Sequence, residues 1–195
     1  MSIGETKAWE LLKTLDPEDV CKRAAVKYKA VERKYIVRSL GRDVSLMLDR
    51  DQIEGDDLFL ERLGYFFRFS ALYYLSTAIE IQPAGRLIKP SDLKGGQAFF
   101  SSTHALPLDG LAAKYSVNSD LFLQRGADLG GKPASFGDAS LQLLPLPRIP
   151  VCLILWEQDD EFQARADLLF DSSAAMQAPL DILWSAAMMT ILAMM

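Results

Sequence analysis

The chain has 195 residues, of which 50% are hydrophobic and 24% are charged, and its 26 acidic and 21 basic side chains give a net charge of −5. This composition predicts a globular protein with one domain over residues 1–195. The acidic balance argues against nucleic acid as a partner, because phosphate binding depends on Lys and Arg. Cys21 and Cys152 are too far apart in the sequence for a disulfide scaffold or a metal knuckle, so we expect no metal site.

Two apolar stretches raise the question of a membrane. The stretch 58–81 is interrupted by Glu61, Arg62 and Arg68, and the stretch 182–195 has 14 residues, fewer than the ~20 needed to span a bilayer. Both are predicted to be buried helices. The start of the chain lacks the apolar core of a signal peptide. We therefore expect a soluble, cytoplasmic protein with no membrane partner.

Two short helices are predicted at the start of the chain. Apolar residues recur there with the spacing of one helix face, at positions Ala8, Leu11, Leu12 and Leu15. Asp16 followed by Pro17 is typical of an N-cap with proline at the first helical position, which predicts a second helix from residue 17 to about residue 25.

A β-hairpin is predicted next, with strands at 32–40 and 43–48. Apolar and polar residues alternate in both strands, and Gly41 supplies the turn between them. Glu32 interrupts the basic residues between positions 22 and 34, so we interpret them as a solvated face and not as a binding patch. Residues 49–57 are polar and are predicted to form a loop. The sequence leaves open whether the hairpin joins the main sheet.

The longest predicted helix covers residues 58–80. Apolar side chains occupy most of its circumference, so we expect the fold to enclose it. Its aromatic side chains could line a cofactor pocket, although such a set belongs more often to a core; they are Tyr65, Phe66, Phe67, Phe69, Tyr73 and Tyr74. A short strand is predicted at 86–90, followed by helices that begin at Pro107 and Asp120.

Three strand-like runs between positions 136 and 171 form the predicted centre of the fold. The middle run, 150–156, is apolar at every position after its proline, which is typical of a strand covered on both faces. Its neighbours alternate with a period of two, with Leu141 on one run and Leu168 on the other. With a final helix at 180–194, the pattern predicts an α+β fold: a mixed or mainly antiparallel sheet whose buried central strand is packed by several helices.

Two features could carry chemistry. His104 is the sole histidine and lies in a loop rich in Ser and Thr. It could act as a general base or a metal ligand, or its ring nitrogens could only form hydrogen bonds with backbone groups of the loop. Asp159, Asp160 and Glu161 form an acidic turn, which could hold a cation, supply a catalytic carboxylate pair or be an ordinary solvated tip. No Ser/His/Asp arrangement and no phosphate-binding glycine loop is recognisable.

Two longer stretches carry a family resemblance. They are GGQAFFSSTHALPLDGLA, from Gly95, and FGDASLQLLPLPRIPVCLILWEQDDEFQARADLLFDSSA, from Phe136. Followed by a final helix, they resemble the domain-of-unknown-function family DUF3786. The resemblance implies a setting in anaerobic bacteria or archaea, and some family members carry an added iron–sulfur segment rich in cysteine. In this chain Cys21 and Cys152 alone cannot supply the four thiolates of a cluster.

Three functional hypotheses stay open, and the cofactor is unknown at this point. The first is an accessory or binding module of anaerobic metabolism, which binds a small hydrophobic cofactor, such as a corrinoid or tetrapyrrole, or a redox or cofactor-carrying partner protein. The second is an enzyme whose site joins His104 to Asp159, Asp160 or Glu161. The third is a homodimer formed through exposed helix faces or through the methionine-rich final segment, which contains Met188, Met189, Met194 and Met195.

Overall fold

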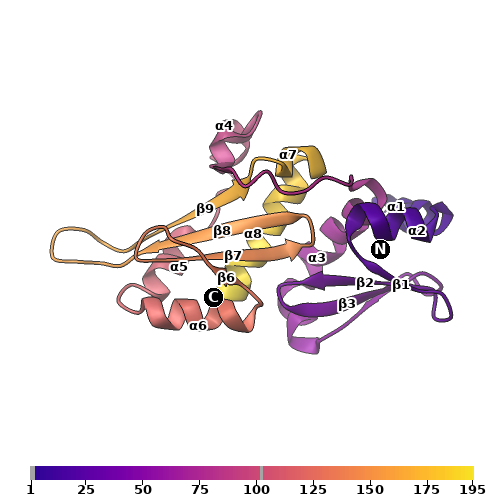
Figure 1. Cartoon of the computed structure of the whole chain (residues 1–195), viewed down its shortest axis with the longest axis horizontal. Helices are drawn as coiled ribbons and strands as arrows, with labels where there is room; N and C mark the ends of the chain where they lie inside the picture. Colours follow the sequence, from indigo (N-terminus) through magenta and orange to yellow (C-terminus); the bar gives the residue numbers. More distant parts are fainter. Residues whose placement is uncertain (1–2, 102) are drawn as a thin grey trace.

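Two separate sheets organise the computed structural model, which describes residues 3–101 and 103–195 (Figure 1). Each strand pairs with its neighbours in the antiparallel sense. The first sheet has the order β1-β2-β3-β4, with β1 (Lys27–Lys29), β2 (Lys34–Ser39), β3 (Arg42–Met47) and β4 (Gln52–Glu54). The second has the order β5-β9-β8-β7-β6, with β5 (Leu87–Ile88), β6 (Lys132–Pro133), β7 (Ala139–Leu146), β8 (Ile149–Trp156) and β9 (Arg165–Asp171). The predicted α+β class is confirmed.

The helical segments of the described residues are α1 (Ile3–Thr14), α2 (Pro17–Ala24), α3 (Asp57–Thr77), the 3-10 turn η1 (Pro90–Asp92), α4 (Gly96–Phe99), α5 (Leu108–Lys114), α6 (Ser119–Asp128), α7 (Ala174–Gln177) and α8 (Leu180–Met194). Helices α2, α3, α5, α6 and α8 begin within one residue of the predicted positions. Asp16 accepts a hydrogen bond from the N–H of Glu18, and Asn118 accepts one from the N–H of Leu121, so side chains cap α2 and α6. Among the helices of the described residues, none combines the length and the apolar character that crossing a bilayer requires.

The central strand β8 is the buried spine of the second sheet. All of β8 is buried except its half-buried last residue. Leu153 pairs with Leu141 of β7 on one side and with Leu168 of β9 on the other. Helix α8 packs on one face. A loop covers the other face so closely that a Cβ on Gly137 would lie 2.6 Å from the carbonyl oxygen of Leu155. The prediction of a strand buried on both faces is confirmed.

Helix α8 is the enclosed helix of this fold, and α3 is not. α8 packs against both the second sheet and α3 (Figure 1), and its Met189 and Met194 are fully buried. These methionines therefore do not form an exposed face. On α3, by contrast, Leu58 is 74% exposed and Tyr65 is 80% exposed. The prediction that helix 58–80 is enclosed is wrong, because α8 covers one side of α3 and α1 covers only part of the other.

The end of α3 also differs from the prediction. The helix ends at Thr77 and not at residue 80, because the backbone that follows bonds to other parts of the chain. Arg23 donates from Nη1 to the carbonyl oxygen of Ala78 at 3.1 Å. The side-chain amide of Gln177 bonds both the N–H and the carbonyl oxygen of Ile79, at 3.1 and 3.0 Å.

Two predictions for the first sixty residues are wrong in detail. Trp9 and Leu12 of α1 are fully buried, whereas Leu11 is 49% exposed, so the buried face is rotated toward Trp9. The predicted loop at 49–57 contains the edge strand β4, which pairs with β3. Polar side chains are compatible with an edge strand, because one of its sides faces water.

The hairpin β2–β3 docks on the second sheet without joining it. The N–H of Leu40 donates to the carbonyl oxygen of Leu144 at 2.9 Å. The buried hydroxyl of Ser39 donates to the carbonyl oxygen of Pro145 at 2.7 Å. Residues of both sheets belong to one contiguous hydrophobic core. The two sheets therefore share a core but no strand pairing.

Arg148, in the turn between β7 and β8, ties the second sheet to α2 and α3. Its guanidinium donates to three backbone carbonyl oxygens, those of Arg23 (2.7 Å), Lys22 (3.0 Å) and Ile81 (3.0 Å). Its N–H donates to the hydroxyl of Tyr74, which donates in turn to the carbonyl oxygen of Ala24. Arg148 is only 9% exposed. We call this residue and its hydrogen bonds the Arg148 clamp. A cation at the C-terminal end of α2 is favourable, because that end of a helix carries partial negative charge.

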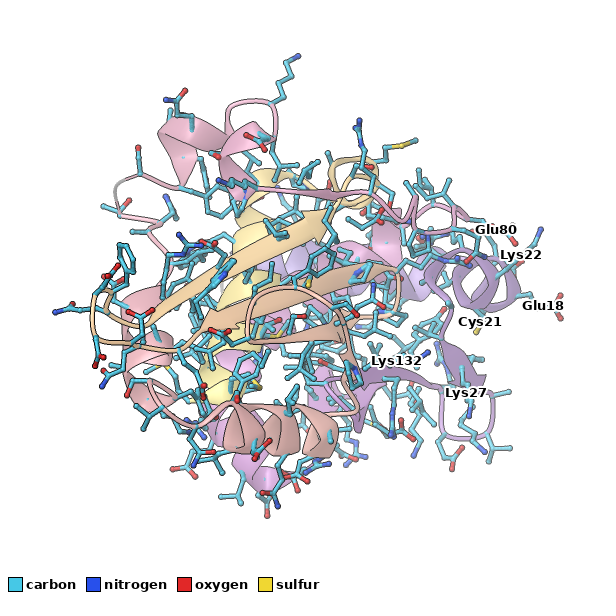
Figure 2. All side chains as sticks on the ribbon, turned by 60° about the vertical axis from the view of Figure 1, so that its left-hand side comes forward. Glu18, Cys21, Lys22, Lys27, Glu80 and Lys132 are labelled. Atoms are coloured by element: carbon cyan, nitrogen blue, oxygen red, sulfur yellow. The ribbon has the colours of Figure 1, made fainter. Side chains whose placement is uncertain are left out.

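Several basic residues between positions 22 and 34 form ion pairs with carboxylates at the surface. Figure 2 shows Lys22 of α2 beside Glu80, with which it forms an ion pair at 3.0 Å. Arg33 pairs with Asp49 at 2.9 Å. These contacts agree with the interpretation of the stretch as a solvated face.

Asp171, at the end of β9, holds the loop that follows α3. Its carboxylate accepts hydrogen bonds from the N–H groups of Ala84 and Gly85, at 2.8 and 2.7 Å, and from the N–H and hydroxyl of Ser173, at 2.9 and 2.6 Å. Burial, which leaves Asp171 only 1% exposed, acts to raise its pKa. The four hydrogen bonds outweigh burial and lower the pKa of Asp171 below its ordinary value.

Replacing Arg148 with methionine tests the Arg148 clamp. We expect Arg148→Met to lower the free energy of unfolding by about 3 kcal/mol, because buried carbonyl oxygens lose their charged donor. Urea denaturation followed by tryptophan fluorescence measures the change. Arg38→Met is the matched control, since Arg38 forms only an exposed pair with Asp43 at 3.1 Å, worth at most about 1 kcal/mol. Equal losses in the two variants would contradict the clamp.

The lowered pKa of Asp171 predicts a pH-dependent stability difference. A carboxyl whose folded-state pKa is depressed contributes stability above its unfolded-state pKa of about 4, and this contribution is lost as the pH falls through the folded-state pKa. Asp171→Asn should therefore be less stable than the parent protein at pH 7, and the difference should shrink below about pH 4. Urea denaturation at a series of pH values measures it. Asp167→Asn, on the same strand, serves as the control, and a pH-independent difference for Asp171→Asn would refute the assignment.

Candidate functional site

A groove along the outer side of α3 is the principal candidate site. Tyr65, Phe69 and Tyr73 are 80%, 51% and 37% exposed, and their spacing of four places them on one stripe of the helix. The groove has a volume of about 500 Å³ and is lined by Gly4, Glu5, Ala8, Tyr65, Arg68, Phe69, Leu72 and Tyr73. We call these residues of α1 and α3 the aromatic groove.

The aromatic groove continues past Tyr65 into a neighbouring hollow of about 380 Å³, which adds Ile53, Leu60 and Gly64 to the lining. Gly64 lies in the interior of α3, where glycine costs about 1 kcal/mol relative to alanine. A Cβ at this position would meet only the Cβ of Leu60, at 3.8 Å, so packing does not require a glycine. The absence of a side chain instead leaves the hollow open.

Charge plays a small part in the lining of the aromatic groove. Arg68 donates from Nη1 to Glu5 at 3.0 Å, so the one cation and the one anion of the lining form an ion pair. The other side chains of the lining are aromatic or aliphatic. A concave site of this composition binds ring systems by stacking and apolar contact, with a few polar groups to fix their orientation.

His104 lies in an aromatic cluster and not in the aromatic groove. Its ring stacks on Phe99, with centroids 4.1 Å apart and planes at 14°, and meets the ring of Trp184 at 5.1 Å in an edge-on arrangement. Trp184 contacts Phe66 of α3 in the same edge-on way at 5.5 Å. The Nδ1 atom of His104 lies 3.4 Å from the hydroxyl of Thr103. The imidazole is thus packed as an aromatic ring.

The acidic turn is exposed and bonds mainly within itself. Asp159 accepts hydrogen bonds from the N–H groups of Glu161 and Phe162, at 2.8 and 2.7 Å, and these bonds lower the pKa of Asp159. Asp160 and Glu161 are exposed. The contacts described for this turn and those of His104 have no residue in common. The described contacts therefore do not bring His104 and the acidic turn into one cleft, as the enzyme hypothesis requires.

Neither cysteine has the environment of a metal or cluster ligand. Burial raises the pKa of Cys152 to about 11. Burial, followed by the charge of Asp16, also raises the pKa of Cys21. Both shifts favour the protonated thiol over the thiolate that ligates a metal. Within residues 3–101 and 103–195, His, Cys, Asp and Glu side chains form no group of three or more that could hold a metal ion.

The sequence grouped the aromatic residues of α3 together, and the structure separates them. Phe67 and Tyr74 are fully buried, whereas Tyr65, Phe69 and Tyr73 line the aromatic groove. One signal could have separated the two sets. Glu61 lies four residues before Tyr65 and therefore on the same stripe of the helix, and a charged residue on a stripe marks its exposed side.

Comparison with known proteins identifies a family. A family model described as "Domain of unknown function (DUF3786)" matches residues 16–193, nearly the whole chain. No curated protein and no solved structure matches the chain. The resemblance inferred from the stretches at Gly95 and Phe136 is confirmed. The aromatic groove lies almost wholly within the matched residues, since only Gly4, Glu5 and Ala8 precede them.

Two substitutions of His104 distinguish packing from chemistry at this position. We expect His104→Phe to keep the free energy of unfolding within about 1 kcal/mol of the parent value, because a phenyl ring preserves the stack on Phe99. His104→Ala removes the ring and should cost about 2 kcal/mol. Urea denaturation of both variants measures these changes. If phenylalanine destabilises as much as alanine does, the ring nitrogens matter and a packing role is insufficient.

Proposed function

We propose that this chain, which belongs to the DUF3786 family, is an accessory binding module of anaerobic metabolism that holds a planar hydrophobic cofactor of the tetrapyrrole or corrinoid class in its aromatic groove. The observation that carries the proposal is the stripe of Tyr65, Phe69 and Tyr73, which are exposed above a hollow of about 500 Å³. The anaerobic setting is taken from the family resemblance and is part of the proposal.

Exposed aromatic surface supports a binding role. Most large apolar side chains of α3 are turned toward the core, yet three aromatic rings stay in water on one stripe of the same helix. A contiguous apolar patch rimmed by polar residues marks a ligand or protein interaction site more often than chance exposure. Covering the rings with a flat ligand would remove apolar area from water, which favours binding at roughly 25 cal/mol per Å².

The shape and charge of the groove support a large ring with acidic or amide substituents. The main groove and its neighbouring hollow share Glu5, Tyr65 and Arg68, so a ligand longer than one aromatic ring can span both. Arg68 is the cation of the lining and is suited to a carboxylate or amide group at the ligand edge. The lining contains no histidine, so stacking and apolar contact would hold the ring.

The proposal is tested by titrating the purified protein with haemin and, separately, with hydroxocobalamin, and by following the ligand's visible absorbance and the quenching of protein fluorescence. We expect saturable binding of at least one ligand with one site per chain. Phe69→Ser should weaken this binding at least tenfold, which corresponds to about 1.4 kcal/mol, because a central stacking surface is lost.

Phe162→Ser is the matched control, because Phe162 is also an exposed phenylalanine, 69% exposed, but lies in the acidic turn. The Phe162→Ser variant should bind the ligand with the same affinity as the parent protein. Equal weakening in both variants would show non-specific adsorption to exposed rings. The absence of saturable binding by either ligand would reject the cofactor, and would leave a redox or cofactor-carrying partner protein as the occupant to test at the same groove.

A further inference from the structure

A second cavity, of about 780 Å³, is lined by residues of the β2–β3 hairpin, the start of α3, α6 and the C-terminal end of α8. It is lined by Arg42, Asp56, Leu58, Phe59, Glu61, Arg62, Leu63, Arg125, Leu129 and Ala193. We call it the arginine cavity. It shares no lining residue with the aromatic groove.

The arginines that line this cavity have no acidic partner among the described residues, whereas most other arginines do. Ion pairs with carboxylates are formed by Arg23, Arg33, Arg38, Arg50, Arg68 and Arg165, and Arg148 belongs to the clamp. Apart from Arg148, four arginines of the described residues have no carboxylate oxygen within 4.0 Å. They are Arg42, Arg62, Arg86 and Arg125, and all except Arg86 line the arginine cavity.

These three guanidinium groups keep most of their donors available. Arg125 is anchored by Nε and Nη2, which donate to the carbonyl oxygen of Ala193 at 2.9 and 2.6 Å, and this leaves Nη1 without a partner among the described residues. Arg42 makes one long hydrogen bond, from Nη1 to the carbonyl oxygen of Asp128 at 3.5 Å. Arg62 makes neither a hydrogen bond nor an ion pair with the residues that the structure describes. A guanidinium has five N–H donors in a planar fork that suits oxyanions.

The acidic side chains of the lining do not neutralise the three arginines. Asp56 is occupied at the start of α3, where it accepts a hydrogen bond from the N–H of Phe59 at 2.9 Å. Glu61 forms no ion pair with an arginine of the cavity within 4.0 Å. Lys114, which donates to the last carbonyl oxygens of α8, adds further positive charge beside Arg125. Burial first, and then the charges of Arg125 and Arg62, lower the pKa of Lys114.

We propose that the arginine cavity binds a small organic anion, whose carboxylate or phosphate group is held by Arg42, Arg62 and Arg125. The apolar part of the lining, formed by Leu58, Leu63 and Leu129 among others, receives the uncharged body of the same molecule. The ligand class is therefore an anion with an apolar ring or chain. This site goes beyond the aromatic groove, and its occupant is a small anion in place of a large planar ring.

Isothermal titration calorimetry at low salt tests the site with three probes of similar body: phenyl phosphate, benzoate and the neutral benzyl alcohol. We expect one of the two anions to bind saturably, with one site per chain, and the alcohol to bind at least tenfold more weakly. Tighter binding of phenyl phosphate assigns the site to phosphate compounds, and tighter binding of benzoate assigns it to carboxylates. No saturable binding by either anion, or equal binding of the alcohol, overturns the proposal.

Arg62→Met is the informative variant, because Arg62 is exposed and has no partner whose loss would disturb the fold. It should weaken anion binding at least tenfold and leave the thermal unfolding midpoint unchanged. Arg86→Met is the matched control, since Arg86 also lacks a carboxylate partner but lines a different cavity. Equal weakening in the two variants would reduce the effect to general surface charge and overturn the assignment. Arg62→Lys should recover part of the affinity, because it restores the charge but not the fork.

Discussion

The position of α3 depends on a buried cation that has no buried anion beside it. Arg148 enters the core from the turn between β7 and β8 and is satisfied by backbone carbonyl oxygens of α2 and of the segment after α3. Desolvating a guanidinium is costly unless hydrogen bonds replace its contacts with water, and carbonyl oxygens at the end of a helix offset this cost through their partial negative charge. Tyr74 of α3 belongs to the same network. The Arg148 side chain thus fixes the positions of the second sheet, α2 and α3 relative to one another.

This arrangement explains why α3 has an exposed apolar stripe. A helix that packs between a sheet and a second helix, as α8 does, can be apolar on every side. α3 meets α8 on one side only, and α1 on the other leaves the aromatic groove uncovered. Once the Arg148 clamp and α8 fix the rotation of α3 about its axis, Tyr65, Phe69 and Tyr73 cannot turn inward without exposing Phe67 and its neighbours. The exposure of the three rings is therefore a consequence of packing on the opposite face.

Local signals in the sequence predicted local structure well, and the contacts between distant segments could not be read from them. The unbroken apolar run of β8, the hairpin at Gly41 and the cap at Asp16 depend on neighbours a few residues away, and the structure contains all three. Which of two apolar helices is enclosed depends on the layer that each one joins, and composition does not encode this. The same limit applies to His104, because its ring contacts with Phe99 and Trp184 bring together residues up to 85 positions apart. The sequence singled out this histidine for its chemistry, whereas its described contacts are those of a packed ring.

Helix α3 takes part in both candidate binding sites, with different segments of its length. The residues of α3 that line the arginine cavity lie between Leu58 and Leu63, and those that line the aromatic groove lie between Tyr65 and Tyr73. The boundary falls at Gly64, where no side chain separates the groove from its neighbouring hollow. The two candidate sites are therefore built on one helix. The Arg148 clamp holds the C-terminal part of α3 through Tyr74, and Asp56, which lines the arginine cavity, caps its N-terminal end.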